Sequence, residues 1–73
     1  GNTEQAMIYY QAALDQAPDY HLARSYMGQG MAATGDYEGA KNQLRQIAAR
    51  GGKNSWAYFA LKKAIVSGSQ TDY

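Results

Sequence analysis

The chain resembles itself when it is shifted by 34 residues, and this internal repeat limits the fold more than any other feature. Small and apolar residues fall on similar residues in the two halves. The matched pairs are Gly1 with Gly35, Glu4 with Glu38, Ala6 with Ala40, Tyr10 with Leu44, Ala13 with Ile47, Ala23 with Ala57, Met27 with Leu61 and Met31 with Ile65. A period of this length predicts stacked units, each of which buries its apolar face against its neighbours.

A turn around Gly35 separates two helical patterns in the middle of the chain. Gly35 can adopt the left-handed conformation that ends a helix, and the carboxylate of Asp36 can cap the helix that follows. The second pattern then stops at Gly51 and Gly52. These signals predict a helical hairpin.

Four helices are expected, each with apolar residues at three- and four-residue spacing. The expected ranges are 4–17, 19 or 20 to 34, 36–49 and 55–67, followed by a polar, frayed tail over 68–73. Asn2 or Thr3 is the expected cap of the first helix, and Asn54 or Ser55 that of the fourth. Pro18 cannot continue the first helix and should end it. The predicted fold class is therefore all-α.

Two glycines, Gly28 and Gly30, lie inside the second helical pattern. Each costs about 1 kcal/mol of helix stability relative to alanine, so we expect a neighbouring backbone to approach Gly28 closely. The expected inward stripe of this helix is Ala23, Met27, Gly30, Met31 and Thr34. The predicted core of the whole chain is Tyr10, Ala13, Met27, Met31, Tyr37, Leu44, Ile47, Tyr58, Leu61 and Ile65.

The pattern of small, aromatic and proline residues resembles that of the tetratricopeptide repeat family. The matching residues are Ala6, Tyr9, Tyr10, Gln11, Ala13, Leu14, Pro18, Met27, Gly28, Met31, Gly35, Asp36, Tyr37, Glu38 and Ala40. The resemblance implies stacked helical hairpins: a domain over 1–67 with the second helix of a partial repeat over 1–18, a full repeat over 19–52, and the first helix of a third repeat, or a capping helix, over 53–67.

Four positions depart from the family pattern. Arg24 stands where a large aromatic or apolar residue is usual, and Gly51 and Gly52 stand where an acid and a proline are common. Lys62 occupies the place in the fourth helix that Gly28 holds in the second. Because a lysine there would obstruct a closely packed following helix, we expect the fourth helix to cap the array.

Family membership would imply protein–protein recognition in a concave groove lined by the first helices of successive repeats. The groove positions would be Leu22, Ser25, Tyr26, Gln29 and Ala33 in the second helix, and Trp56, Phe59, Ala60 and Lys63 in the fourth. Trp56 and Phe59 are expected to contribute most, since aromatic side chains dominate binding hot spots. Packing of both rings against the second helix or the tail is the alternative. A clamp for a partner's terminal carboxylate is disfavoured, because only Gln29 and Lys63 could serve in it.

Two other interaction classes stay open. Self-assembly would pair chains through the exposed face of the first helix or a second stripe of the fourth, made of Trp56, Phe59, Lys63 and Val66.

The net charge is only +1, but the range 39–71 contains six basic residues and no acidic residue. Lys41, Arg45, Lys62 and Lys63 could therefore contact an acidic partner. Nucleic acid is disfavoured, because no exposed aromatic residues are interleaved on that face.

Catalysis is not expected, and neither is a cofactor or a metal. A chain of 73 residues buries only a modest core, which leaves little to support a catalytic cleft. Cysteine is absent and His21 is the sole histidine, so no ligand set for a metal is apparent. Gly28 and Gly30 lie inside a helical pattern and do not form a phosphate-binding loop. No apolar run approaches the roughly 18 residues of a membrane span.

Overall fold

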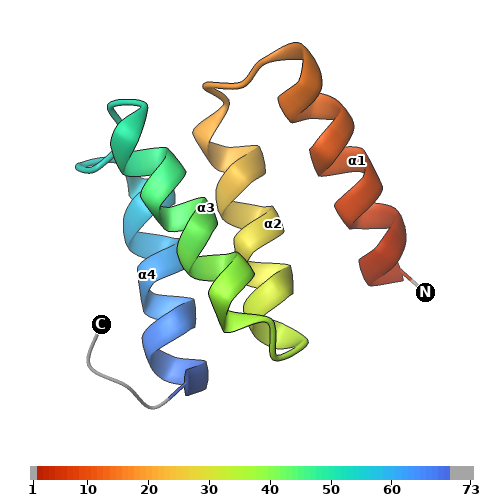
Figure 1. Ribbon diagram of the computed structural model, residues 1–73, viewed down its shortest axis with the longest axis vertical. Helices are drawn as coiled ribbons and strands as arrows, with labels where there is room; N and C mark the ends of the chain where they lie inside the picture. Colours follow the sequence, from red (N-terminus) through yellow and green to blue (C-terminus); the bar gives the residue numbers. More distant parts are fainter. Residues whose placement is uncertain (1, 70–73) are drawn as a thin grey trace.

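The computed structural model describes residues 2–69, with side chains from 4 to 68, and consists there of four α-helices and no strand. These are α1 (Asn2–Gln16), α2 (His21–Ala33), α3 (Tyr37–Ala49) and α4 (Trp56–Ser69). Consecutive helices run in opposite directions, so α2 and α4 run in the same direction, and both start at the same end of the molecule (Figure 1). The predicted all-α class is confirmed.

The predicted turn and cap residues act as expected. Gly35 has a φ of 92° and Gly51 a φ of 87°, the left-handed values that end α2 and α3. Asp36 caps α3, because its Oδ1 accepts a hydrogen bond of 2.9 Å from the backbone N–H of Gly39. Ser55, rather than Asn54, caps α4, since its Oγ accepts a bond of 3.3 Å from the N–H of Tyr58. Local sequence therefore sets these helix ends.

Two helix ends extend beyond the predicted ranges, and the other ends lie within two residues of the prediction. Helix α1 begins at Asn2, so both residues predicted to cap it belong to the helix, and their side chains lie outside the described set. Helix α4 continues to Ser69, so the first two residues of the predicted frayed tail are helical. Gly68 packs near Tyr37: a β-carbon there would lie 3.0 Å from the tyrosine hydroxyl. The rest of the predicted tail, 70–73, lies outside the described residues.

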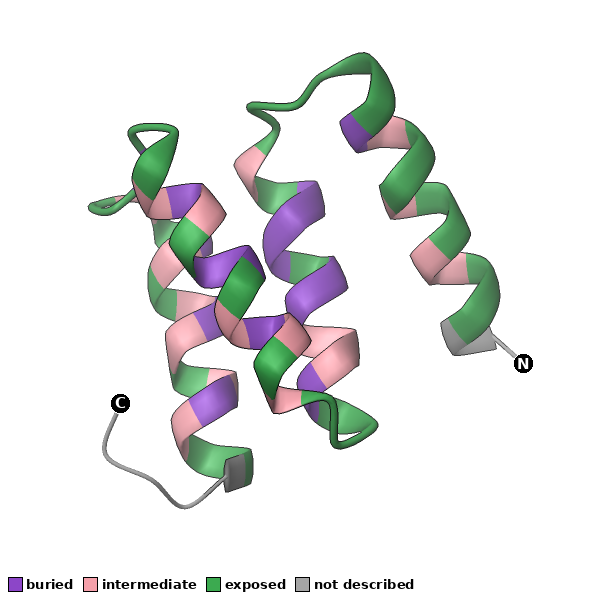
Figure 2. Cartoon of the chain, viewed as in Figure 1, coloured by how far each residue is buried: buried purple, intermediate pink, exposed green. Residues whose placement is uncertain are grey.

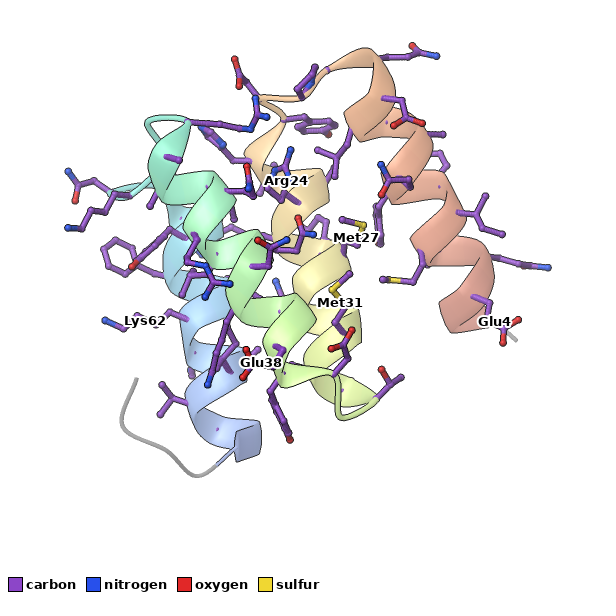
Figure 3. The ribbon with its side chains drawn as sticks, in the orientation of Figure 1. Glu4, Arg24, Met27, Met31, Glu38 and Lys62 are labelled. Atoms are coloured by element: carbon purple, nitrogen blue, oxygen red, sulfur yellow. The ribbon has the colours of Figure 1, made fainter. Side chains whose placement is uncertain are left out.

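The buried side chains form two clusters that meet at Met31. The larger lies between α2, α3 and α4 and comprises Ala32, Ala40, Leu44, Ile47, Leu61 and Ile65. The smaller joins α1 to α2 and comprises Leu14, Ala23 and Met27. Figure 2 shows the buried positions on the facing sides of the helices, and Figure 3 shows Met27 and Met31 on the side of α2 that faces α1. Every predicted core residue is buried or partly buried.

Thr34 is the one member of the predicted α2 stripe that does not point inward. It is the C-cap of α2 and is exposed, with its hydroxyl bonded to the carbonyl groups of Gly30 and Met31. A threonine at a helix end can satisfy free carbonyl groups in this way without being buried. The apolar stripe of α2 therefore ends at Met31.

Gly28 is a point of close approach, as predicted, but the neighbours are side chains and not a backbone. A β-carbon at this position would lie 2.7 Å from one methyl group of Leu61 and 3.2 Å from Cβ of Gln43. Leu61 belongs to α4 and Gln43 to α3, and both are buried. Gly28 therefore allows α2 to contact α3 and α4 at one position.

Alanine substitution at the two helical glycines should separate this packing effect from helix propensity. Alanine favours the helix by about 1 kcal/mol at either site, but Gly28→Ala must also displace the fully buried Leu61, at about 1–3 kcal/mol. At Gly30 the nearest atom is the sulfur of Met7, at 3.3 Å and at the flexible end of its side chain. Urea unfolding should show Gly28→Ala to be less stable than Gly30→Ala by about 1–3 kcal/mol. Equal stabilities would contradict the close approach.

Candidate functional site

A hollow of about 470 Å³ lies between the first turns of α2 and α4. Its lining comes from the start of both helices, which lie together because the helices run in the same direction: Asp19, Tyr20, His21, Leu22, Ser55, Trp56 and Ala57. The side chain of Trp56 is 65% exposed and that of Leu22 is 38% exposed. The hollow therefore presents an aromatic and an aliphatic side chain to solvent.

Ser55 fixes the start of α4 and with it the position of Trp56. Its hydroxyl donates a hydrogen bond of 2.6 Å to the carbonyl oxygen of Gly52 and accepts from the N–H of Tyr58. Gly52 is itself close to the ring of His21, since a β-carbon there would lie 2.9 Å from Cδ2 and Nε2. Nδ1 of His21 is buried and has no hydrogen-bond partner among the described side chains. The histidine ring therefore packs against Gly52 and is only partly exposed where it lines the hollow.

Arg24 connects the turn before α2 to α3. Its Nη1 donates a hydrogen bond of 3.0 Å to Oε1 of Gln43, and its Nη2 donates one of 2.9 Å to the carbonyl oxygen of Pro18. Burial lowers the pKa of the Arg24 guanidinium, and the nearby charge of Arg50 lowers it further, while Asp19 raises it. This arginine departs from the family pattern, and its polar contacts replace the apolar packing expected there.

Arg50 makes a second connection to the same turn. Its Nη1 lies 3.0 Å from Oδ1 of Asp19, so the end of α3 is paired with the residue that follows Pro18. Both arginines therefore hold the segment that supplies Asp19 and Tyr20 to the hollow. An exposed ion pair of this kind contributes about 1 kcal/mol or less, so the buried Arg24 is the more important of the two.

Ser25 does not belong to the accessible surface, contrary to the prediction. It is fully buried, and its hydroxyl donates a bond of 2.7 Å to the carbonyl oxygen of Ala57, while Nε2 of Gln29 donates to the same hydroxyl. Ser25 lies one turn before Gly28 and so shares the face that approaches α4. Its burial follows from the same close contact.

The other predicted site residues are spread over the surface. The ring of Tyr26 lies against Tyr10 of α1, with centroids 5.8 Å apart. The rings of Phe59 and Tyr58 form a T-shaped pair with centroids 5.7 Å apart, and Phe59 does not line the hollow. Ala33 and Lys63 are exposed, whereas Gln29 and Ala60 are partly buried. Of the predicted residues, only Leu22 and Trp56 share the hollow.

Sequence reasoning missed the residues that precede the groove positions. Tyr20, His21 and Ser55 line the hollow because the two helix starts lie side by side, which the 34-residue period implies. The 34-residue period could have identified these residues, because it aligns those at the start of α2 with those at the start of α4.

The predicted basic residues lie on two helices, Lys41 and Arg45 on α3 and Lys62 and Lys63 on α4. Lys41 lies 3.8 Å from Glu38, so its charge is partly offset. Lys62 points away from the rest of the helices (Figure 3), and Lys63 lies about 100° further round α4. Within residues 4–68, no three potential metal ligands are grouped together. None of the four described helices is long and apolar enough to cross a membrane.

Comparison with protein families gave one finding. The model of the tetratricopeptide repeat matches residues 1–65. Comparison with curated proteins and with solved structures gave no match.

Replacement of Arg24 should reveal its role in holding the turn. Arg24→Leu leaves the buried Oε1 of Gln43 without its donor, at a cost of about 1–3 kcal/mol in the free energy of unfolding. Adding Gln43→Leu should recover part of this loss, because it removes the buried acceptor on α3 that Arg24→Leu leaves without a donor. Arg45→Leu, on the exposed face of α3, should stay within about 0.5 kcal/mol of the parent. Urea unfolding that gives Arg24→Leu and Arg45→Leu the same stability would refute this role.

Proposed function

This chain belongs to the tetratricopeptide repeat family, whose members generally mediate protein–protein interactions, and on that premise we propose that it binds a segment of a partner protein. The proposed site is the hollow between α2 and α4 with the groove that continues from it. The tetratricopeptide repeat is a non-catalytic scaffold.

The exposure of Trp56 beside Leu22 is the observation that carries this proposal. A tryptophan buries about 150–250 Å² on full burial, and about two-thirds of that area is still exposed here. At about 25 cal/mol per Å², a partner that covered the ring would gain roughly 2–4 kcal/mol. This is the magnitude of a binding hot spot.

The remaining groove residues support a polar continuation of the site. Leu22, Trp56, Gln29 and Lys63 form the proposed groove, with Ala33 at the far end of α2 and Tyr26 at its α1 side. Ser25 is withdrawn from the site because it is buried. Phe59 is exposed, lies one turn after Trp56 on the same stripe of α4, and stays a proposed groove residue outside the hollow.

Peptide selection offers a direct test, because it requires no knowledge of the natural partner. A displayed library of random peptides would be selected on the chain, and the affinities of the selected peptides measured by fluorescence anisotropy. Trp56→Ala and Leu22→Ala should each weaken binding, Trp56→Ala by about tenfold or more. Tyr9→Ala is the matched control, since this aromatic residue is 71% exposed but lies on α1, outside the hollow.

Circular dichroism would establish that all three variants keep their helix content. If the selected peptides bind Trp56→Ala as tightly as the parent, or lose affinity only with Tyr9→Ala, the proposed groove is wrong.

Self-assembly through α1 is the second candidate, and the exposure of Ile8 and Tyr9 favours it. Both side chains are 71% exposed, and among the described helices α1 packs only against α2. A second hollow of about 270 Å³ lies on α1 and is lined by Tyr9, Ala12, Ala13 and Gln16. The exposed side of α1 faces away from the other helices (Figure 2). A second helical surface could bury these side chains.

Sedimentation velocity over a wide concentration range decides this second candidate. If α1 pairs chains, the weight-average mass should rise with concentration, and replacing both Ile8 and Tyr9 by serine should abolish the rise. Phe59→Ser tests the fourth helix in the same way and should leave the rise unchanged. A constant monomer mass at all concentrations would exclude assembly through either helix.

A further inference from the structure

We propose that Met7 is a modification site: a peroxide oxidises its thioether to the sulfoxide, and this change releases α1 from α2. The surface proposed above to bind a partner is not involved. Three features support the site. They are the position of the sulfur atoms of the chain, the attachment of α1 through one small apolar cluster, and the partial exposure of Met7.

The sulfur atoms of the chain gather where α1 meets α2. The chain has three methionines and no cysteine. Met27 belongs to the buried cluster that joins these two helices, and Met7 and Met31 are partly buried against it. Figure 3 shows Met27 and Met31 on the side of α2 that faces α1. An oxidant that acts on thioethers would therefore act at this contact.

Helix α1 depends on that cluster for its place in the fold. Among the described helices it packs only against α2, whereas α2, α3 and α4 each pack against the other two. Leu14 is the one buried residue among the described side chains of α1, and Met7, Tyr10 and Ala13 are partly buried around the cluster. A contact with so few buried side chains opens at a lower free energy than the rest of a fold.

Met7 combines partial exposure with a close contact to the backbone of α2. A β-carbon at Gly30 would lie 3.3 Å from Sδ of Met7, so the glycine leaves room for the thioether. Met27 is only 4% exposed. A peroxide therefore has access to Met7 in the folded chain, whereas Met27 becomes accessible only when α1 moves away from α2.

The oxidation transfers one oxygen atom to the sulfur. A lone pair on the sulfur attacks one oxygen of hydrogen peroxide, and the O–O bond breaks as the S–O bond forms. The departing hydroxide takes the proton from the transferred oxygen and leaves as water. The sulfur loses an electron pair and the peroxide gains it. The product is a polar sulfoxide, which a methionine sulfoxide reductase converts back to the thioether.

A sulfoxide at position 7 weakens the contact between α1 and α2. Its oxygen would need a hydrogen-bond donor if it stayed buried, but the N–H of Gly30 is used within α2. The oxidised side chain therefore turns to water, and its apolar contact with α2 is lost. Leu44, Ile47 and Leu61, which hold α3 and α4 against α2, carry no sulfur and stay packed.

Timed exposure of Met31→Leu to hydrogen peroxide tests the order of oxidation, because only Met7 and Met27 can then react as thioethers. Leucine replaces methionine at nearly constant volume and is well tolerated in a core. The matched control adds Met7→Leu, which leaves Met27 as the sole thioether. Peptide mapping by mass spectrometry should show Met7 oxidised before Met27. Oxidation of Met27 should be about tenfold slower or more in the control.

Hydrogen exchange would show which part of the fold opens. Once Met7 is oxidised, amide exchange in α1 should become about tenfold faster, while exchange in α3 and α4 stays unchanged. A methionine sulfoxide reductase should restore the slow exchange. The control variant, exposed to the same peroxide, should keep α1 protected. Met7→Gln in the parent chain, without oxidant, should speed up exchange in α1 as the sulfoxide does, because glutamine is polar and of similar length.

Three results would overturn the proposal: Met27 that oxidises equally fast with and without Met7→Leu, exchange in α1 that oxidation of Met7 leaves unchanged, or equal acceleration in all four helices. Amides of α1 that are unprotected before oxidation would also overturn it. The same measurements on the parent chain, oxidised only until Met7 carries oxygen, apply if a leucine variant does not fold.

Discussion

The close contact at Gly28 is the constraint on which the rest of the structure depends. Leu61 of α4 and Gln43 of α3 occupy the space that a side chain at position 28 would need. This places α4 beside α2 closely enough for Ser25 to bond the backbone of α4. It also brings the starts of α2 and α4 to one end, where Trp56 and Leu22 share a hollow. Because Gly28 has no side chain, three helices can pack closely, and the surface proposed to bind a partner depends on this packing.

Buried polar groups also hold the segment before α2 that lines the hollow. Arg24 occupies a position where the family usually has a large apolar residue, and it reaches both Gln43 and the carbonyl group of Pro18. A buried guanidinium is costly where its donors are unpaired. The two bonds pair Nη1 and Nη2 of Arg24 and hold the turn in place, while Nε is buried without a partner among the described residues. The turn leads directly into Tyr20 and His21, which line the hollow. Arg24, which departs from the family pattern, therefore holds the turn that leads into the proposed site.

The sequence predicts local features of this fold well and contacts between helices less well. Gly35, Asp36 and Ser55 were predictable because a turn or a cap depends on a few neighbouring residues. Ser25 was not, because its hydroxyl is buried only when a carbonyl group of α4, 32 positions along the chain, lies against it. Trp56 and Phe59 were predicted together, yet only Trp56 reaches the hollow, because the hollow lies at the start of α4 and Phe59 is one turn further along. Periodicity indicates which residues share a side of a helix but not what lies opposite them.

The central claim is that the starts of α2 and α4 form one binding surface. The most direct test is a two-dimensional ¹H–¹⁵N NMR titration of the chain with a peptide selected on it. The structure predicts that the largest shift changes occur in Tyr20, Leu22, Ala57 and the indole N–H of Trp56, with smaller changes extending towards Gln29 and Lys63. Changes confined to α1, or to the exposed side of α3, with the Trp56 indole signal unmoved, would contradict the claim.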